Sequence, residues 1–295
     1  MKIKKALSFI SFKRRCKGSS FLIFRSTVAV CLFVFASQSV WAQVNLSGKS
    51  GLMYIPNATA YEDASLSFGY NYNPLKYSLR SKQRNAERVL FANLTLLPRL
   101  TITLSLLQPV TTDTKIREGL GDRQLDISYL LIKEKPRVPS VAVIISSPFM
   151  IETAMLTNVL VATKHFNLNK DLKLETTAGY GSPYILSREG DFKLNLANSN
   201  IFSNLKFQKK SDFIFNNGYL VGPFAGVKLG YRNKAGLMTE WDSQHLNVGA
   251  YLTLWKTWTV QGGLLNGDRF IFGSSIHFQL LKPKKSIAKL DETLN

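Results

Sequence analysis

A serine and a histidine near the carboxyl end have the spacing for nucleophilic catalysis. Ser275 and His277 are two positions apart, so on an extended strand both side chains lie on the same face. A hydrolase of this kind also needs a polar residue that orients the histidine, and the sequence does not identify one. We therefore expect both to be ordinary polar residues of a strand, and we predict that the protein is not an enzyme.

Metal or cofactor chemistry finds less support. The three histidines, His165, His245 and His277, are scattered, and the two cysteines, Cys16 and Cys31, both lie close to the amino end. Zinc sites need three or four clustered histidine, cysteine or carboxylate ligands. We expect neither a metal nor a cofactor.

Two neighbouring carboxylates are candidates for binding. Glu240 and Asp242 point to the same side of a strand and could act as a pair. We expect a solvated or ion-paired patch that faces Lys164 or Lys173, and we count Lys164 among the candidate binding residues.

A second candidate group is cationic. Lys206, Lys209 and Lys210 lie close together in a stretch that also carries several phenylalanines. Clustered positive charge suits anionic partners. We expect these lysines to hold an acidic glycan, or a partner protein that carries it.

Most of the chain alternates apolar and polar residues, which is typical of strands that separate two environments. In the last run, Phe272, Ile276 and Phe278 fall on one face, and Ser275 and His277 fall on the other. A strand of about ten residues with one apolar face is the unit of a transmembrane β-barrel. About twelve such runs are predicted, near residues 64–72, 87–97, 100–107, 124–133, 139–147, 157–166, 171–180, 220–232, 236–243, 245–254, 256–265 and 269–280.

We therefore predict an all-β fold, a single antiparallel transmembrane β-barrel of about twelve strands spanning residues 64–281. The alternative is a soluble β-sandwich in the periplasm, which also alternates because one face of each sheet is buried. The barrel is favoured because aromatic residues recur at strand ends, as in membrane girdles, and because charged residues lie on the faces opposite the apolar ones. The charges inside strands are Asp126, Lys164, Glu175, Glu240 and Asp242.

Two stretches interrupt the alternation. Residues 43–63 precede the first strand, and we expect a loop or a segment that folds into the lumen. Residues 182–217 form the longest interruption, and an insertion of that length is often functional, as a lumen plug or an external loop. Residues 282–295 are predicted to form a basic and polar tail.

The amino end has the pattern of a secretory signal peptide. A basic region precedes a short apolar run, and small residues offer a cleavage site after Ala42, so residues 1–42 are the predicted leader. Their removal takes away eight basic residues and no acid, which lowers the net charge from +19 to +11. The chain remains basic, which suits lipopolysaccharide or an acidic polysaccharide. Nucleic acid is disfavoured by the export signal.

Short blocks distributed along the chain carry a family resemblance. They are residues 51–58, the turn with Gly119, Gly121 and Asp122, and residues 160–164, 178–183, 222–227, 239–242 and 266–270. In their order and spacing these blocks resemble the YjbH family of exopolysaccharide-biosynthesis proteins of the bacterial outer membrane.

The resemblance implies an outer-membrane barrel that assists the assembly or export of a secreted or capsular polysaccharide. It also implies partner proteins of the same pathway. Two alternatives remain open: a general diffusion porin, and a structural scaffold that docks periplasmic partners. A twelve-stranded barrel is narrow, so an accessory role is expected in preference to a conduit.

Overall fold

The structure is a computed structural model, and it describes residues 43–59, 64–80, 84–97, 99–110, 121–149, 154–188, 205–213 and 215–280. The predicted leader, the predicted tail and Gly119 lie outside these residues. Within them, no helix has the length and apolar character that a membrane span requires.

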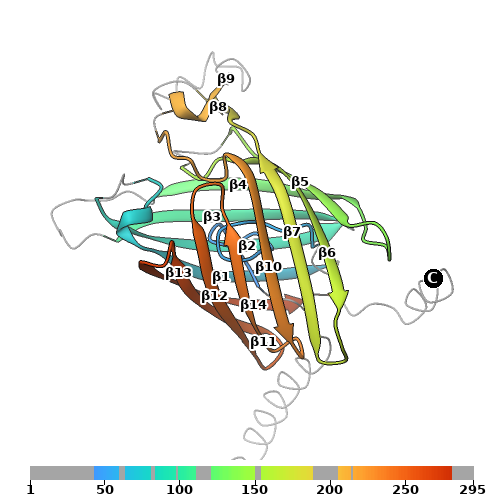
Figure 1. Ribbon diagram of the computed structural model, residues 1–295. Coiled ribbons are helices and arrows are strands. Elements are labelled where there is room, and N and C mark those ends of the chain that lie inside the picture. Colours follow the sequence, from blue (N-terminus) through green and yellow to red (C-terminus); the bar gives the residue numbers. More distant parts are fainter. Residues whose placement is uncertain are drawn as a thin grey trace, which may run out of the picture. The chain divides into compact units, whose positions relative to one another are not determined.

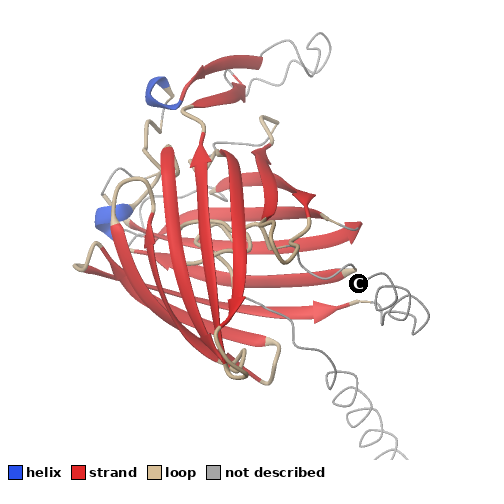
Figure 2. Cartoon of the chain, turned by 45° about the vertical axis from the view of Figure 1, so that its right-hand side comes forward, coloured by secondary structure: helices blue, strands red, loops and turns tan. Residues whose placement is uncertain are grey.

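Twelve strands form a closed antiparallel barrel in the order β1-β14-β13-β12-β11-β10-β7-β6-β5-β4-β3-β2 (Figures 1 and 2). Neighbours in the barrel are neighbours in the chain, except where β7 meets β10 and where β1 closes on β14. The predicted fold class and strand number are confirmed. The bounds are β1 Ser65–Asn73, β2 Ala86–Leu97, β3 Leu100–Val110, β4 Asp122–Ile132, β5 Ser140–Ser146, β6 Asn158–Asn167, β7 Leu172–Gly181, β10 Gly222–Tyr231, β11 Ala235–Trp241, β12 Leu246–Leu254, β13 Trp258–Leu265 and β14 Arg269–Gln279.

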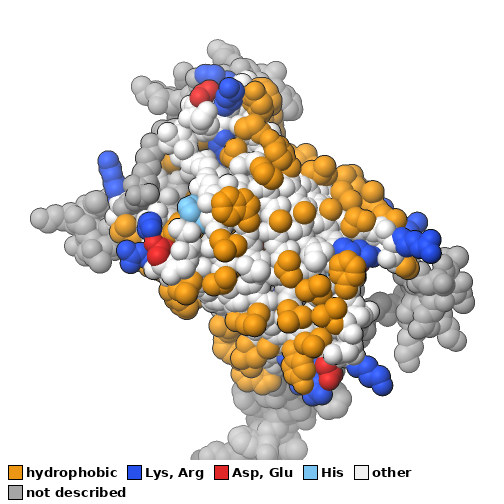
Figure 3. Space-filling view, viewed as in Figure 1, with side chains coloured by type: hydrophobic (Ala, Val, Ile, Leu, Met, Phe, Trp, Pro, Cys, Tyr) orange, Lys and Arg blue, Asp and Glu red, His pale blue; other side chains and the backbone are white. Residues whose placement is uncertain are grey.

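The wall separates an apolar exterior from a polar interior. On β14, the outward Phe270 and Phe272 are 58% and 40% exposed, whereas the inward Ser275 and His277 are buried. Apolar side chains are spread over the outer face of the barrel (Figure 3). An apolar surface of this extent matches hydrocarbon and not water. The barrel is therefore a transmembrane barrel and not a soluble sandwich.

Aromatic pairs on the outside cover the seam where the first and last strands meet. Phe68 on β1 stacks on Phe278 of β14, with ring centroids 5.5 Å apart. Tyr72 stacks on Phe272 at 5.1 Å. Aromatic pairs across neighbouring strands stabilise a sheet and favour one register.

The two rims differ in the length of their connections. Ser65 pairs with Gln279, so both ends of the barrel lie at one rim. The described turns at that rim are residues 133–139, 168–171, 232–234 and 255–257. The opposite rim carries the longer connections 74–85, 111–121, 147–157 and 182–221. Outer-membrane barrels have short periplasmic turns and long extracellular loops, so we name the first rim the periplasmic rim and the opposite rim the extracellular rim.

The long insertion contains a separate hairpin. β8 (Tyr184–Arg188) pairs with β9 (Leu205–Lys209), outside the barrel sheet. In Figure 1 this hairpin projects beyond the extracellular rim. The 3₁₀ turn η2 (Lys210–Asp212) follows, and then Tyr219 and Leu220 are buried.

Candidate functional site in the lumen and at the periplasmic rim

Residues 43–59, the lumen segment, lie inside the barrel, where Figure 2 shows them as a loop enclosed by strands. Nearly every residue from 43 to 58 is buried. Polar contacts join the segment to β1, β2, β4, β6, β7, β11 and β13. The wall residues that make these contacts are Asn71, Asn93, Asp126, Thr163, Glu175, Glu240 and Gln261. The segment therefore crosses the lumen, which agrees with the expectation of an inward fold.

Glu240 holds the middle of the lumen segment. Its carboxylate accepts the backbone N–H groups of Met53 at 3.0 Å and Tyr54 at 2.7 Å. Asn247 also donates to it, at 3.2 Å. A turn of backbone buried inside a barrel has no water to bind its N–H groups, so a carboxylate that accepts two of them stabilises the turn.

The expected patch of Glu240 and Asp242 facing Lys164 or Lys173 is corrected by these contacts. Asp242 instead accepts the N–H of His245 at 2.8 Å and the side-chain amide of Asn247 at 2.9 Å, which shapes the β11–β12 connection. Lys164 lies near the periplasmic rim and pairs with Glu134 at 2.9 Å. The two-residue spacing correctly predicted a shared face, but the sequence does not indicate that backbone N–H groups occupy it.

Glycines in the wall make room for the apolar part of the segment. A Cβ on Gly249 or Gly263 would lie 2.5 or 2.4 Å from Sδ of Met53. A Cβ on Gly226 would lie 2.8 Å from the side chains of Leu52 and Ile55. A Cβ at any of these positions would force the side chains of the lumen segment to shift, so the three inward glycines leave the space that these side chains fill.

An ion pair fixes the amino-terminal half of the segment. Lys49 Nζ lies 2.7 Å from Asp126 Oδ2, and both side chains are almost completely buried. Asp126 also accepts a hydrogen bond from Gln124 at 2.8 Å. Sequence reasoning placed Asp126 on the inner face but missed Lys49, because the position of an irregular segment cannot be obtained from strand periodicity.

A second ion pair joins the neighbouring strands β7 and β10. Lys228 Nζ is 2.5 Å from Glu175 Oε2, and both are buried. Asn57 of the lumen segment donates to the other oxygen of Glu175 at 2.8 Å, and His165 Nε2 lies 3.3 Å from Oε2. Sequence reasoning missed Lys228, although its alternation with Gly226 along β10 gives the signal for an inward position.

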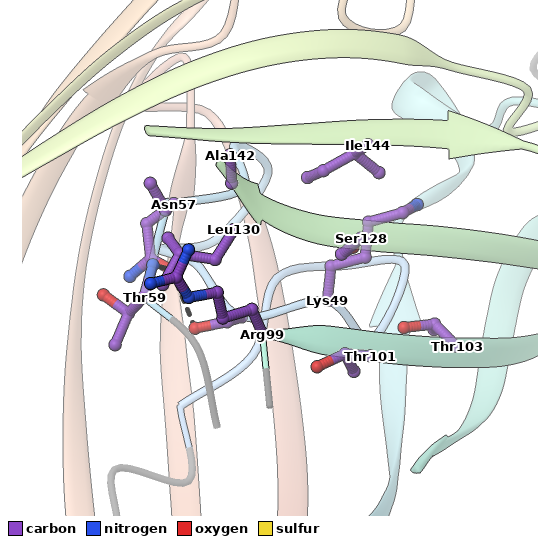
Figure 4. A pocket seen from close by; sticks show the side chains of 12 residues that line it. Lys49, Asn57, Thr59, Arg99, Thr101, Thr103, Ser128, Leu130, Ala142 and Ile144 are labelled. Atoms are coloured by element: carbon purple, nitrogen blue, oxygen red, sulfur yellow. Dashed lines mark hydrogen bonds between the residues drawn. The ribbon is translucent and has the colours of Figure 1, made fainter. Parts of the chain in front are cut away.

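A small pocket remains between the lumen segment and the wall formed by β3, β4 and β5 (Figure 4). Hydroxyl groups dominate its polar lining, and Arg99 from the β2–β3 turn and Lys49 from the segment add positive charge. The pocket is lined by Lys49, Ser50, Asn57, Ala58, Thr59, Arg99, Thr101, Thr103, Ser128, Leu130, Ala142 and Ile144. Because Arg99 belongs to a periplasmic turn, this remaining space lies toward the periplasmic end of the lumen.

The structure separates the three lysines that the sequence places together. Lys206 and Lys209 are exposed on the hairpin, whereas Lys210 is buried. The Nζ of Lys210 donates to the carbonyls of Leu156 and Tyr219 at 2.8 and 2.7 Å. Burial, with a smaller contribution from the charge of Lys49, lowers the pKa of Lys210 to about 7. Lys210 therefore joins loops at the extracellular rim and is inaccessible to a glycan, which corrects its expected role.

Positive charge gathers instead on the periplasmic turns. In the described turns at this rim the exposed basic residues outnumber the two acids, Glu134 and Asp171. Asp171 accepts a two-pronged contact from Arg232, at 3.0 and 3.1 Å, and Glu134 pairs with Lys164. We name the remaining exposed basic residues the rim cations: Lys133, Lys135, Arg137, Lys170, Lys234 and Lys256.

The family-like turn is structural where it is described. Gly121 has a φ of +86°, and a Cβ there would lie 2.3 Å from the carbonyl oxygen of Leu107. Asp122 is buried, pairs with Arg80 at 2.7 Å and accepts the N–H of Ala154 at 3.1 Å. These contacts join three extracellular connections.

Ser275 and His277 lie on the same inner face of β14, as predicted, and both are buried. Across the described residues, no group of three or more histidine, cysteine or carboxylate side chains is arranged to hold a metal ion.

A match to a protein-family model identifies the family of this chain. The YjbH family, described as "Exopolysaccharide biosynthesis protein YbjH", matches residues 43–294. The chain belongs to this family. The YjbH match covers the lumen segment together with every strand of the barrel, and the resemblance inferred from the sequence is confirmed. No curated protein matches the chain.

Solved structures with some likeness to this YjbH chain include two structures of one porin and one structure of an outer membrane channel. The KdgM porin is 8% identical, with 72% of this chain and 98% of that chain covered and a TM-score of 0.40. The KdgM porin in complex with disordered oligogalacturonate has the same identity and coverage and a TM-score of 0.39. The COG4313 outer membrane channel from Pseudomonas putida F1 is 11% identical, with 74% and 96% covered and a TM-score of 0.35.

Proposed function

We propose that this YjbH protein is a non-enzymatic accessory barrel in the secretion or assembly of an exopolysaccharide or capsule. The observation that carries this proposal is the lumen segment, whose contacts reach seven of the strands around the wall. A general diffusion porin needs an open water-filled lumen. A barrel whose lumen holds the buried lumen segment is better suited to binding a glycan or docking a partner protein than to free diffusion.

The rim cations are the proposed contact with an acidic polysaccharide. Six cations on four turns face the periplasm, the side from which a polymer reaches the outer membrane. Spaced cations on flexible side chains suit a polyanion with repeating charges. Salt screens the attraction between these cations and the polyanion and so weakens binding. Family membership favours a glycan over other polyanions, and proteins of the same pathway are further proposed partners.

The leader belongs to the same proposal. A protein that reaches the outer membrane needs an export signal, and residues 1–42 supply the expected pattern. Mass spectrometry of the protein purified from outer membranes should give an amino terminus at Gln43. A chain that retains residues 1–42 would contradict cleavage at this site.

Deletion of the gene in the native host tests the function. We expect less secreted or capsular polysaccharide, restored by the wild-type gene, with the protein in the outer-membrane fraction. A variant with all six rim cations replaced by Gln should reach the outer membrane but restore little of the polysaccharide. Arg84→Gln, at the opposite rim, should restore the polysaccharide fully. Unchanged polysaccharide in the deletion strain would contradict the proposal.

Binding measurements separate glycan recognition from the scaffold alternative. The purified protein should bind alginate, a polyuronate, but not neutral dextran, and the six-fold Gln variant should bind alginate at least tenfold more weakly. Equal binding by the variant would contradict the role of the rim cations. Co-purification of pathway proteins without any glycan binding would favour the scaffold.

A further inference from the structure

The two faces of the β8–β9 hairpin differ: one is exposed, and the other has Ile185 and Ser187 buried beside an exposed Lys206. Directly opposed residues share a face in an antiparallel pair, and the register places Leu186 opposite Phe207 and Tyr184 opposite Lys209. Ile185, on the other face, is buried. Tyr184 and Phe207 stack with centroids 5.2 Å apart, yet Phe207 remains 69% exposed. The exposed face is therefore apolar, with a lysine at one end.

This face continues the membrane-facing surface of the barrel. Leu186 lines a shallow groove together with Ile145, Leu160 and Tyr180, which point outward from β5, β6 and β7. In Figure 3, apolar side chains run from the hairpin down to the outer wall. Exposed apolar patches of this kind mark interaction sites, because leaving them in water costs about 25 cal/mol per Å².

The position in the membrane indicates the ligand. The hairpin lies at the extracellular rim, where the outer leaflet of a Gram-negative outer membrane consists of lipopolysaccharide. The groove lies beneath the hairpin on the lipid-facing wall, and Lys209 is exposed on the same hairpin face as Leu186 and Phe207. An acyl chain in the groove would thus place a lipid phosphate near a cation, and lysine is a frequent phosphate ligand.

We propose that the hairpin face and the groove below it bind one lipopolysaccharide molecule. An acyl chain packs against Leu160, Tyr180 and Leu186, and Lys209 contacts a phosphate of the lipid A headgroup. This assigns Lys209 to a lipid and not to the secreted glycan. It stands independently of the proposed function, because the rim cations lie at the opposite rim.

The test is lipid binding by the full-length protein in detergent, followed by native mass spectrometry. The probes are bis-phosphorylated lipid A, dephosphorylated lipid A and phosphatidylglycerol. The wild type should retain bis-phosphorylated lipid A at least tenfold better than either other lipid. Lys209→Gln should abolish that preference, and Leu186→Asn should weaken both forms of lipid A. Arg84→Gln, which removes an exposed cation from the 74–85 connection at the same rim, should retain all three lipids as the wild type does.

The proposal would be overturned by equal retention of the two forms of lipid A by the wild type, by an unchanged preference in Lys209→Gln, or by equal retention of phosphatidylglycerol. Displacement of lipid A by alginate would assign the hairpin to a glycan and would overturn it as well. Lys209 is exposed, so its variant should fold. The heat-modifiable shift in gel mobility, which folded barrels show, checks the folding of every variant.

Discussion

The carboxylate of Glu240, on β11, accepts the backbone N–H of Tyr54 at 2.7 Å in the middle of the lumen. The contact joins residues far apart in the chain. It holds a turn whose own residues belong to no strand. Burial raises the pKa of Tyr54 well above its usual range, and its hydroxyl donates to Asn73 at 2.6 Å. The lumen segment is therefore anchored through its backbone and through its side chains.

Replacement of Glu240 should loosen the lumen segment. Glu240→Ala leaves the amides of Met53 and Tyr54 without their acceptor, at a cost of about 1–3 kcal/mol for each buried group. Amide hydrogen exchange at residues 53 and 54 should accelerate at least tenfold. Glu240→Gln keeps one acceptor oxygen and should give an intermediate rate. Exchange in Glu240→Ala as slow as in the wild type would show that the carboxylate does not hold the turn.

Breaking the Lys49–Asp126 pair should destabilise the whole barrel. Asp126→Ala leaves a buried ammonium without its carboxylate, and the loss of one partner of a buried pair costs about 3–5 kcal/mol. The free energy of unfolding in lipid, measured with guanidinium, should fall by that amount. The double variant Lys49→Met/Asp126→Leu should recover most of it. A double variant as unstable as Asp126→Ala would indicate that the loss has another origin.

Filling the glycine space should displace the segment. Gly263→Val places methyl groups where Sδ of Met53 lies, so we expect a loss of about 1–3 kcal/mol from overpacking. Met53→Ala removes the clash with Sδ but not the one with the backbone carbonyl of Val248, so it should recover part of the loss, and the pair should show a coupling of at least 0.5 kcal/mol in a double-mutant cycle. Strict additivity of the two substitutions would mean that they do not meet in the lumen.

Lys210 predicts a pH dependence of stability. Its folded pKa, about 7, lies below the ordinary value of 10.5, so between these values the unfolded chain binds the extra proton. The free energy of unfolding should therefore rise with pH between about 7 and 10.5, by a few kcal/mol, and should be flat below pH 7 as far as this group is concerned. Lys210→Met should remove that slope. Identical pH profiles for the wild type and the variant would contradict the assignment.

Strand periodicity predicted the barrel because a wall between lipid and a polar lumen imposes a period of two on every strand. On β14, the faces of Phe272 and Ser275 followed directly from their positions. Glu240 and Asp126 were placed inward for the same reason.

What these inward residues bind could not be predicted, because their partners lie in irregular backbone. Lys49 and Tyr54 have no period that relates them to a wall position, and their distances to Asp126 and Glu240 depend on how one segment folds inside the closed barrel. The burial of Lys210 likewise depends on carbonyls from two separate loops. Clustering along the sequence suggested an exposed basic patch, whereas the fold placed the larger basic surface on turns that are distant in sequence.

Conductance in planar lipid bilayers tests the central claim, that the lumen segment closes the barrel, most directly. The wild-type protein purified from outer membranes should show no steady ohmic conductance, and Glu240→Ala should show intermittent openings as the segment loosens. A steady, open conductance from the wild type, of the size expected for a water-filled pore, would contradict the closed accessory barrel and favour a diffusion porin.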